Sequence, residues 1–261
     1  MGLEKKLENK VAVITGGDSG IGRSIAEAFA NEGASVIITY HRDEAKANTF
    51  SKELSEKNLK HGVYQLDVGD ENDVKLFFRS VIKTFGKVDI LVNNAGTIGS
   101  NSPVREMATE TFDRCLKTNL YGPFFCSRAY LNVWKDTQHY GRIINITSIH
   151  EDVASPGSAD YNASKGGLKN FSRSLALELA PIGITVNNIA PGMILTDMNK
   201  DAVNNEEVRK EQEKNIPAGR AGNVGDINAA AVFLASQESS YVTGSTIFID
   251  GGLRINVGQG A

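Results

Sequence analysis

The stretch VAVITGGDSGIG, residues 11–22, decides the fold of this 261-residue chain. β-prone residues lead into a cluster of small ones, and an amphipathic run follows, which predicts a strand, a tight turn and a helix. Gly16, Gly20 and Gly22 let the backbone turn sharply and approach a ligand closely. The start of the following helix offers unpaired N–H groups and a partial positive charge, so the turn is a candidate phosphate site.

Short apolar runs alternate with amphipathic, helix-length segments along the rest of the chain. Further strands are predicted at 35–39, 63–66, 89–92, 142–146, 184–189 and 246–249. The main helices are predicted at 43–58, 70–85, 104–135 and 161–180. Strands this short and apolar are buried on both faces, which is typical of parallel sheets with right-handed crossovers. We expect an α/β fold with a Rossmann-type, doubly wound parallel sheet of seven strands, in a single domain over residues 1–261.

Composition bounds the class of protein. The hydrophobic content of 41% allows a sizeable core, and the net charge of −3 comes without a block of like charges, so neither nucleic acid nor a membrane surface is an expected partner. Neither a signal-peptide core nor an apolar stretch of ~18 residues occurs, and we expect a cytoplasmic protein.

The two cysteines, Cys115 and Cys126, do not form a CxxC pair. We expect two small buried side chains in a reducing compartment rather than a disulfide. No metal-binding set is expected.

Parallel sheets bind ligands beyond the carboxyl ends of their strands, near the switch in strand order. The second strand is followed by Tyr40, His41 and Arg42, where an acid usually binds the ribose 2′-hydroxyl about 20 residues beyond the glycines. An acid there repels a 2′-phosphate, whereas Arg42 and His41 favour it, so we expect NADP, with NAD accepted as an alternative. A solvated Arg42 at a helix start is the alternative interpretation.

The next two strand ends also carry candidates. Asp67 can accept a hydrogen bond from an adenine amino group, or it can cap the following helix. The sequence NNAG at 93–96 is small and turn-forming, which suits close packing of the backbone against a ribose.

The fifth strand leads to a candidate catalytic set. Ser148 follows this strand, and Tyr161 and Lys165 lie four residues apart on one helix face. A phenol has a pKa of ~10, and bringing it near neutrality needs roughly 3 units, or about 4 kcal/mol. An ammonium one turn away supplies much of this by favouring phenolate. A Tyr-x-x-x-Lys alone also describes a surface Tyr over a Lys stem, but the preceding Ser and the glycine turn favour catalysis.

Together these motifs resemble the short-chain dehydrogenase/reductase family over nearly the whole chain. They are TGGDSGIG at 15–22, NNAG at 93–96, Asn119, Ser148, Tyr161-x-x-x-Lys165, Pro191-Gly192 and Asp250-Gly251-Gly252. The resemblance implies an NAD(P)-dependent oxidoreductase that acts on a secondary alcohol, hemiacetal or ketone. It implies that Tyr161 is the general acid/base, that Ser148 orients the substrate oxygen and that Lys165 lowers the pKa of Tyr161 and binds ribose. Asn119 would hold a proton-relaying water, although its sequence position fits a helix cap equally well.

The same resemblance implies a cofactor-binding set. Its members are Gly16, Ser19, Gly20, Ile21, Gly22, Tyr40, His41, Arg42, Asp67, Val68, Asn94, Ala95, Gly96, Tyr161, Lys165, Pro191, Gly192, Ile194 and Thr196. The segment 191–196 resembles the part that holds the nicotinamide carboxamide. The polar stretch 199–214 lies where the family carries a mobile lid, and a solvated helix is the alternative.

Within the family, the chain is most similar to the bacterial glucose 1-dehydrogenases. The similarity lies in Ser148-Ile149-His150-Glu151, in 164–167, in Asn199 and in 240–244. It implies oxidation of an aldose at C1, with substrate contacts from Ser148, His150, Tyr161 and Asn199. For His150, a structural hydrogen bond is the alternative. Two positions depart from this branch, because 97–100 lacks an acid and Asp160 precedes Tyr161.

Two other functions stay open. One is a ketone reductase such as a 3-oxoacyl carrier-protein reductase, and the other is a nucleotide-binding regulatory protein without catalysis. The intact Ser148, Tyr161 and Lys165 argue against the regulatory protein.

The resemblance also implies a homotetramer. It would pair the helices at 104–135 and 161–180 and place the tail 253–261 near a neighbouring active site. Apolar residues of the second helix, such as Phe171, fit burial between subunits or within one subunit.

Overall fold

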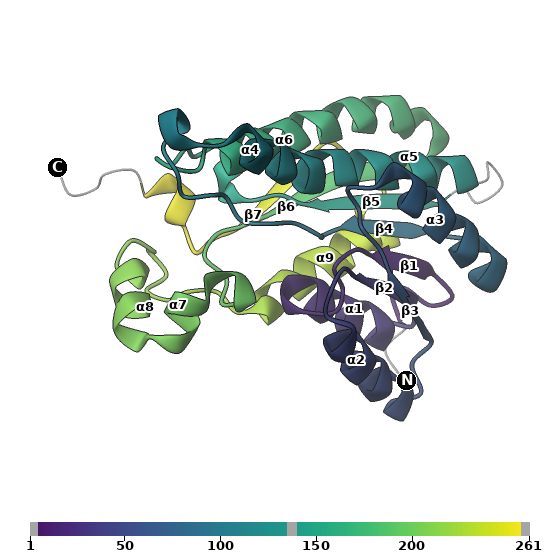
Figure 1. Ribbon diagram of the computed structural model, residues 1–261. Helices are drawn as coiled ribbons and strands as arrows, with labels where there is room; N and C mark the ends of the chain where they lie inside the picture. The colour runs from purple at the N-terminus through teal and green to yellow at the C-terminus, as the bar shows by residue number, and fades with distance from the viewer. Residues whose placement is uncertain (1–4, 135–139, 257–261) are drawn as a thin grey trace.

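The computed structural model describes residues 5–134 and 140–256, and its centre is one parallel sheet (Figure 1). Its strands run in the order β3-β2-β1-β4-β5-β6-β7, and every neighbouring pair is parallel. The strands are β1 (Val11–Ile14), β2 (Ser35–Tyr40), β3 (His61–Gln65), β4 (Ile90–Asn93), β5 (Gly141–Ile146), β6 (Ile184–Pro191) and β7 (Thr246–Ile249). The predicted doubly wound, seven-stranded sheet is confirmed, and its strand order switches between β1 and β4.

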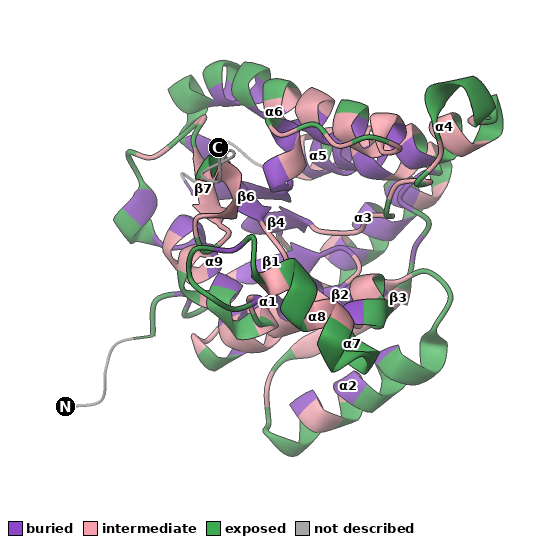
Figure 2. Cartoon of the chain, turned by 90° about the vertical axis from the view of Figure 1, so that its left-hand side faces the viewer, coloured by how far each residue is buried: buried purple, intermediate pink, exposed green. Residues whose placement is uncertain are grey.

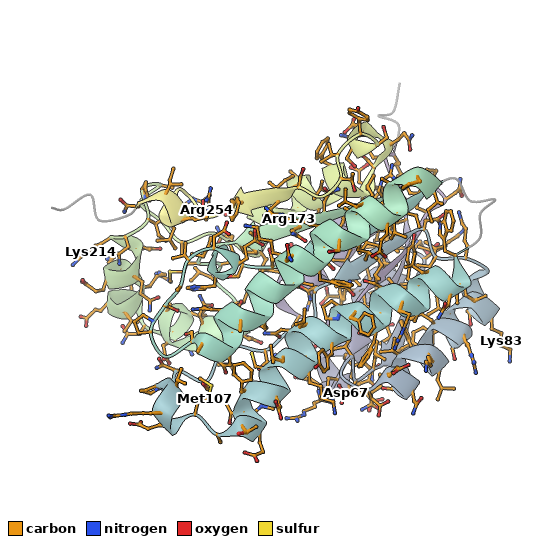
Figure 3. The ribbon with its side chains drawn as sticks, turned by 90° about the horizontal axis from the view of Figure 1, so that it is seen from above. Asp67, Lys83, Met107, Arg173, Lys214 and Arg254 are labelled. Atoms are coloured by element: carbon orange, nitrogen blue, oxygen red, sulfur yellow. The ribbon has the colours of Figure 1, made fainter. Side chains whose placement is uncertain are left out.

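Helices cover both faces of the sheet (Figure 1). The lower layer consists of α1 (Gly20–Asn31), α2 (Glu44–Glu56) and α9 (Asn228–Ala235). The upper layer consists of α3 (Glu71–Phe85), α4 (Thr109–Leu116), α5 (Gly122–Val133) and α6 (Ala159–Leu179). Seen from above, α6 and the α4–α5 segment lie side by side (Figure 3).

Two apolar cores fill the space between the sheet and its helix layers. Ala12 and Ile14 of β1 belong to the core under α1, whereas Val11 and Val13 belong to the core under α3 and α5. Successive strand side chains point to opposite faces, so β1 is apolar throughout because it serves both cores. Cys126 lies in the second core, and both cysteines are free and buried as predicted.

The predicted helix at 104–135 is interrupted. A 3₁₀ turn, η1 (Val104–Glu106), precedes α4, and a π-helical turn, η2 (Lys117–Tyr121), joins α4 to α5. Pro123 at the start of α5 lacks the N–H that a regular α-helix needs there, which explains the irregular turn. The prediction of one continuous helix was therefore wrong. Its predicted end, at residue 135, lies in the segment 135–139, outside the described residues.

Beyond the carboxyl end of β6, the chain forms η6 (Asp197–Asn199), α7 (Lys200–Asn204) and α8 (Glu206–Glu213). Figure 2 shows α7 and α8 on the outside of the molecule, largely exposed. The other 3₁₀ turns in the described residues are η4 (Ile149–Glu151), η5 (Ala180–Ile182), η7 (Val224–Ile227), η8 (Gln237–Ser239) and η9 (Leu253–Ile255). No helix in the described ranges is long and apolar enough to cross a membrane.

Candidate active site

A cavity of about 1200 Å³ opens at the carboxyl ends of the strands. Its walls come from the turns that follow β1 to β6, as expected for a doubly wound sheet. The structure brings most predicted site residues together here, namely Gly16, Ser19, Gly20, Ile21, Tyr40, His41, Arg42, Asp67, Val68, Asn94, Ala95, Gly96, Ser148, Tyr161, Lys165, Pro191, Gly192, Ile194, Thr196 and Asn199. Gly22, Asn119 and His150 do not line the cavity.

The glycine turn is fastened to the NNAG turn. The side-chain Nδ2 of Asn94 donates to the carbonyl oxygens of Thr15 and Gly16, each at 2.9 Å. A Cβ atom at Gly22 would lie 2.3 Å from the Gly16 oxygen and 2.4 Å from Asn94 Nδ2, so no side chain fits. Gly22 thus acts through packing. Ser19 makes no side-chain cap at the start of α1, which leaves this helix N-terminus available for a phosphate.

Arg42 lies in the turn after β2 and lines the cavity. Within the described residues it forms no hydrogen bond or ion pair, and Asp43 is the residue that caps α2. His41 Nε2 lies 3.9 Å from Asp67 Oδ2. Asp67 accepts a hydrogen bond from the N–H of Gly69, and Asp70 caps α3, so the capping alternative for Asp67 was wrong.

One ion pair connects the cofactor side of the cavity to the segment after β6. Lys46 Nζ on α2 lies 2.5 Å from Asp197 Oδ2 at the start of η6, and 3.8 Å from Asp43. Burial, and secondarily the carboxylate of Asp43, raises the pKa of Asp18 in the glycine turn. Asp18, Lys46 and Asp197 were missed, because partners up to 151 residues apart leave no local pattern.

The predicted catalytic side chains converge at the end of β5. Ser148 is the N-cap of η4, and its Oγ accepts a hydrogen bond from the His150 N–H at 3.2 Å. Tyr161 and Lys165 lie one turn apart on α6, and Lys165 Nζ is 5.6 Å from the centre of the Tyr161 ring. Lys165 Nζ donates to the carbonyl oxygen of Ile146 at 2.9 Å.

Burial dominates the acid–base properties of this group. It lowers the pKa of Lys165 to about 8, against the opposing effects of Cys115 and Glu151. Burial also raises the pKa of Tyr161, and a hydrogen bond from Ser148 lowers it in part. The predicted lowering of this pKa by Lys165 does not dominate, because the ammonium is itself desolvated and bonded to a carbonyl. A protonated phenol can donate a proton to a substrate oxygen, and the phenolate can take one back.

Asn119 lies buried in the π-helical turn and holds the chain after the NNAG turn. Its Oδ1 accepts from the Thr97 N–H at 2.8 Å, and its Nδ2 donates to the Thr97 carbonyl at 2.9 Å and to Ser164 Oγ at 3.1 Å. The helix-cap alternative was therefore wrong. A Cβ at Gly96 would lie 3.2 Å from Asn119 Oδ1 and 3.9 Å from Lys165 Nζ. Glycine keeps this space open, and the relay role of Asn119 stays a prediction.

His150 and Asn199, which are predicted to contact only the substrate, also have hydrogen-bond partners within the protein. His150 Nδ1 lies 2.8 Å from the Val153 carbonyl oxygen, and its ring packs edge-on against Tyr161 with centroids 5.9 Å apart. Asn199 Oδ1 accepts from the N–H of Thr196 at 2.8 Å while the residue lines the cavity. Their contacts with substrate stay predictions.

The described residues contain no cluster of three or more His, Cys, Asp and Glu that could hold a metal ion. The arrangement fits a dinucleotide, because a glycine turn with a free helix N-terminus lines the same cavity as Tyr161 and Lys165.

Comparisons with known proteins agree with this geometry. A family model described as enoyl-(acyl carrier protein) reductase matches residues 16–254. Glucose 1-dehydrogenase 2 of Bacillus subtilis (strain 168) is 37% identical over 257 residues, covering 98% of this chain and 99% of the relative. The FabG 3-oxoacyl-[acyl-carrier-protein] reductase of Staphylococcus aureus is 39% identical over 245 residues, covering 94% of this chain and 98% of the relative.

A solved structure is similar over the same length. The gluconate 5-dehydrogenase from Burkholderia cenocepacia J2315, in complex with NADP and tartrate, is 33% identical with a TM-score of 0.89, covering 97% of this chain and 98% of that one. With the family model and the curated relatives, it shows that this chain belongs to the short-chain dehydrogenase/reductase family and is an NAD(P)-dependent oxidoreductase.

Proposed function

We propose that this enzyme oxidises an aldose, β-D-glucose or a close relative, at C1 to the lactone. The observation that carries the proposal is the convergence of Ser148, Tyr161 and Lys165 on one wall of a cavity that Asn199 also lines. A sugar needs several such polar partners around the reacting carbon. The glucose 1-dehydrogenase and gluconate 5-dehydrogenase relatives support a polyhydroxylated substrate.

The glycine turn with the N-terminus of α1, and Lys165, would hold a nicotinamide dinucleotide, which would supply the hydride acceptor for the substrate carbon. Tyr161 as phenolate takes the hydroxyl proton, and Ser148 holds the same oxygen. Lys165 would donate to the ribose hydroxyls of the cofactor and stabilise the phenolate. Asn119, beside the space that Gly96 leaves open near Lys165, would hold the water that passes the proton from Lys165 to solvent.

We propose NADP as the preferred cofactor, with NAD accepted. The free guanidinium of Arg42 at the cavity supports binding of a 2′-phosphate. The carboxylates of Asp18 and Asp43 near Lys46 limit this preference, because they repel the same phosphate. The NADP bound to the gluconate 5-dehydrogenase is consistent with this choice.

A ketone reductase is the second candidate. Ile98 and Met198, which are 57% and 54% exposed, line the cavity and give its mouth an apolar character. The FabG relative acts in this direction on acyl substrates by its name, and a protonated Tyr161 is the form that reduction uses.

We also propose a cytoplasmic homotetramer. Tyr121 and Phe124 are exposed on the α5 side of the upper helix layer, and Leu177 of α6 is 80% exposed. Phe124 and Phe125 contact each other, and Phe171 of α6 packs edge-on against Phe124. Burial of this aromatic face against a second copy would remove it from water.

A substrate panel with both cofactors tests the function. It contains D-glucose, D-galactose, D-xylose, D-gluconate, acetoacetyl-coenzyme A and diacetyl, with NADP(H) or NAD(H) absorbance as the readout. Turnover of an aldose at least a hundredfold more efficient than that of either carbonyl compound is expected. Inert aldoses together with efficient reduction of a carbonyl compound would replace the proposal with the second candidate.

A further inference from the structure

The loop that follows the NNAG turn is fixed at both ends by buried polar side chains. At its start, Asn119 binds both backbone polar atoms of Thr97, at 2.8 and 2.9 Å. At its end, Asp160 Oδ2 accepts a hydrogen bond from the N–H of Ser100 at 3.0 Å. The backbone of 97–100 therefore has little freedom, although it lies outside any helix or strand.

Asp160 is an unusual residue to find at this place. It is 1% exposed and is the second residue of α6, directly before Tyr161. Its Oδ1 accepts from the Tyr161 N–H at 2.8 Å, so its two oxygens bind two backbone donors on different segments. Within the described residues it has no cationic partner. The N–H groups and the dipole at the start of α6 stabilise its negative charge instead.

The same carboxylate brings the loop into contact with Tyr161. A Cβ atom at Gly99 would lie 3.0 Å from Asp160 Oδ1 and 3.0 Å from Tyr161 Cβ, so the backbone of Gly99 rests directly on these two residues. A shift of Asp160 would move both Tyr161 and the loop. The side chain of Asp160 therefore sets the position of the loop relative to Tyr161.

Between the two fixed ends, the loop presents Ile98. This side chain is 57% exposed and lines the cavity, although a large apolar group gains nothing from contact with water. Its backbone neighbours, Thr97 and Gly99, are the residues held by Asn119 and by Asp160 with Tyr161. Ile98 thus forms an apolar wall of fixed position on the substrate side of the cavity.

We propose that Asp160 is a positioning residue and that Ile98 is the specificity-determining residue it positions. The wall formed by Ile98 favours a substrate that presents C–H groups beside the reacting carbon, as the ring face of an aldopyranose does. An open-chain carboxylated sugar such as gluconate offers no such face. This inference rests on the proposed aldose oxidation for its substrate, but the link between Asp160 and the loop does not.

A double-mutant cycle tests the link. It uses Asp160→Asn, Ile98→Ala and the double variant, with kcat and KM for D-glucose and for NADP. Asp160→Asn keeps the shape but turns one oxygen into an NH₂ group that cannot accept from a backbone N–H. We expect each single change to lower kcat/KM for D-glucose about tenfold, and the double variant to lower it no further than Asp160→Asn alone. The KM for NADP should stay within about twofold.

The matched control is Asp70→Asn, because Asp70 also accepts from two backbone N–H groups at a helix start but lies outside the cavity. This control should leave every kinetic constant unchanged. If Asp160→Asn does not fold, Asp160→Ser takes its place, since a hydroxyl retains one acceptor. Multiplicative effects in the cycle, or an equal loss of NADP binding, would show a general structural role and overturn the proposal.

Amide hydrogen exchange tests the positioning role of Asp160 independently of which substrate the enzyme uses. Asp160→Asn should speed exchange at Ser100 while the Thr97 amide, held by Asn119, keeps its protection. Unchanged exchange at Ser100 would overturn the positioning role. If D-glucose is inert, the aldose proposal fails alone, and the cycle is measured with the compound of the panel that is turned over.

Discussion

The Nζ atom of Lys165 donates a hydrogen bond to the carbonyl oxygen of Ile146 at 2.9 Å, which links α6 to the last residue of β5. The partner is a neutral carbonyl, so no carboxylate compensates directly for the 5% exposed ammonium. The protein therefore holds Lys165 in place while making its charged form unfavourable, which is consistent with its lowered pKa.

Lys165→Met should stabilise the fold at neutral pH while it abolishes activity. A pKa of about 8 instead of 10.5 corresponds to about 3 kcal/mol by which burial disfavours the protonated form. Losing the bond to Ile146 offsets about 1 kcal/mol of this gain. Between about pH 8 and 10.5 the unfolded wild-type chain binds more protons than the folded one, so wild-type stability rises with pH and the advantage of the variant shrinks. Urea unfolding of the wild type and the variant from pH 7 to 10.5 measures the difference in stability and its dependence on pH.

Lys83→Met, at an exposed position on α3 (Figure 3), is the control and should show no such pH dependence. Parallel stability curves for the wild type and Lys165→Met would contradict the lowered pKa.

Tyr161→Phe should lower kcat by three orders of magnitude or more, because it removes the only group expected to exchange the proton. The cofactor affinity, measured by NADPH fluorescence, should change less than about threefold, since the glycine turn and Lys165 are untouched. Tyr241→Phe makes the same change at a fully exposed tyrosine that does not line the cavity, and it should leave kcat unchanged. Retention of a tenth of the activity by Tyr161→Phe would contradict the assignment of Tyr161 as the general acid/base.

Arg42→Ala should raise the KM for NADP about tenfold and leave the KM for NAD nearly unchanged. The guanidinium is free to bind a 2′-phosphate, and a charge-assisted hydrogen bond contributes on this order. Arg105→Ala, at an exposed Arg that pairs with Glu106, is the matched control. An equal effect on both cofactors would mean that Arg42 does not contact the 2′ position.

Asn145→Ala should destabilise the protein by about 2–4 kcal/mol. Asn145 is fully buried, accepts from Asn93 Nδ2 and donates to Ser172 Oγ, each at 2.8 Å, and so connects β4, β5 and α6. Its removal leaves buried donors and acceptors short of partners. Chemical denaturation measures the loss, and Asn228→Ala, which removes only a half-buried bond to Ser24, should cost less than half as much.

Phe124→Arg should convert a tetramer into smaller species. A charged group on the aromatic face would have to be desolvated if this face is buried between copies. Multi-angle light scattering at micromolar concentration measures the mass, and Leu76→Arg, at an exposed position of α3, is the control. A wild-type protein that scatters as a monomer would contradict the assembly.

The fold was largely predictable because fully buried strands read as apolar runs, and the glycines mark where the first strand must turn. Predicted strand ends differ from the observed ones by at most two residues, as for β3 at His61–Gln65. The break between α4 and α5 was missed, although Pro123 gave a signal. The bonds of Asn119 to Thr97 and of Asp160 to Ser100 were not predictable, because they join residues 22 and 60 positions apart through loop geometry.

The close packing of Gly22 against Gly16 and Asn94 limits the substitutions that this sequence can accept during evolution. A Cβ atom at Gly22 would lie 2.3 Å from the Gly16 carbonyl oxygen, and one at Gly16 would lie 3.1 Å from the Cα of Ala95, so side chains are poorly tolerated at these two positions. The helix α8, by contrast, has no buried residue, and Ile98 has a largely exposed side chain. Substitutions can therefore accumulate near the substrate end of the cavity and change the substrate, whereas the glycine turn that faces the nucleotide stays the same. The different substrates in the names of the glucose 1-dehydrogenase and 3-oxoacyl reductase relatives are consistent with that division.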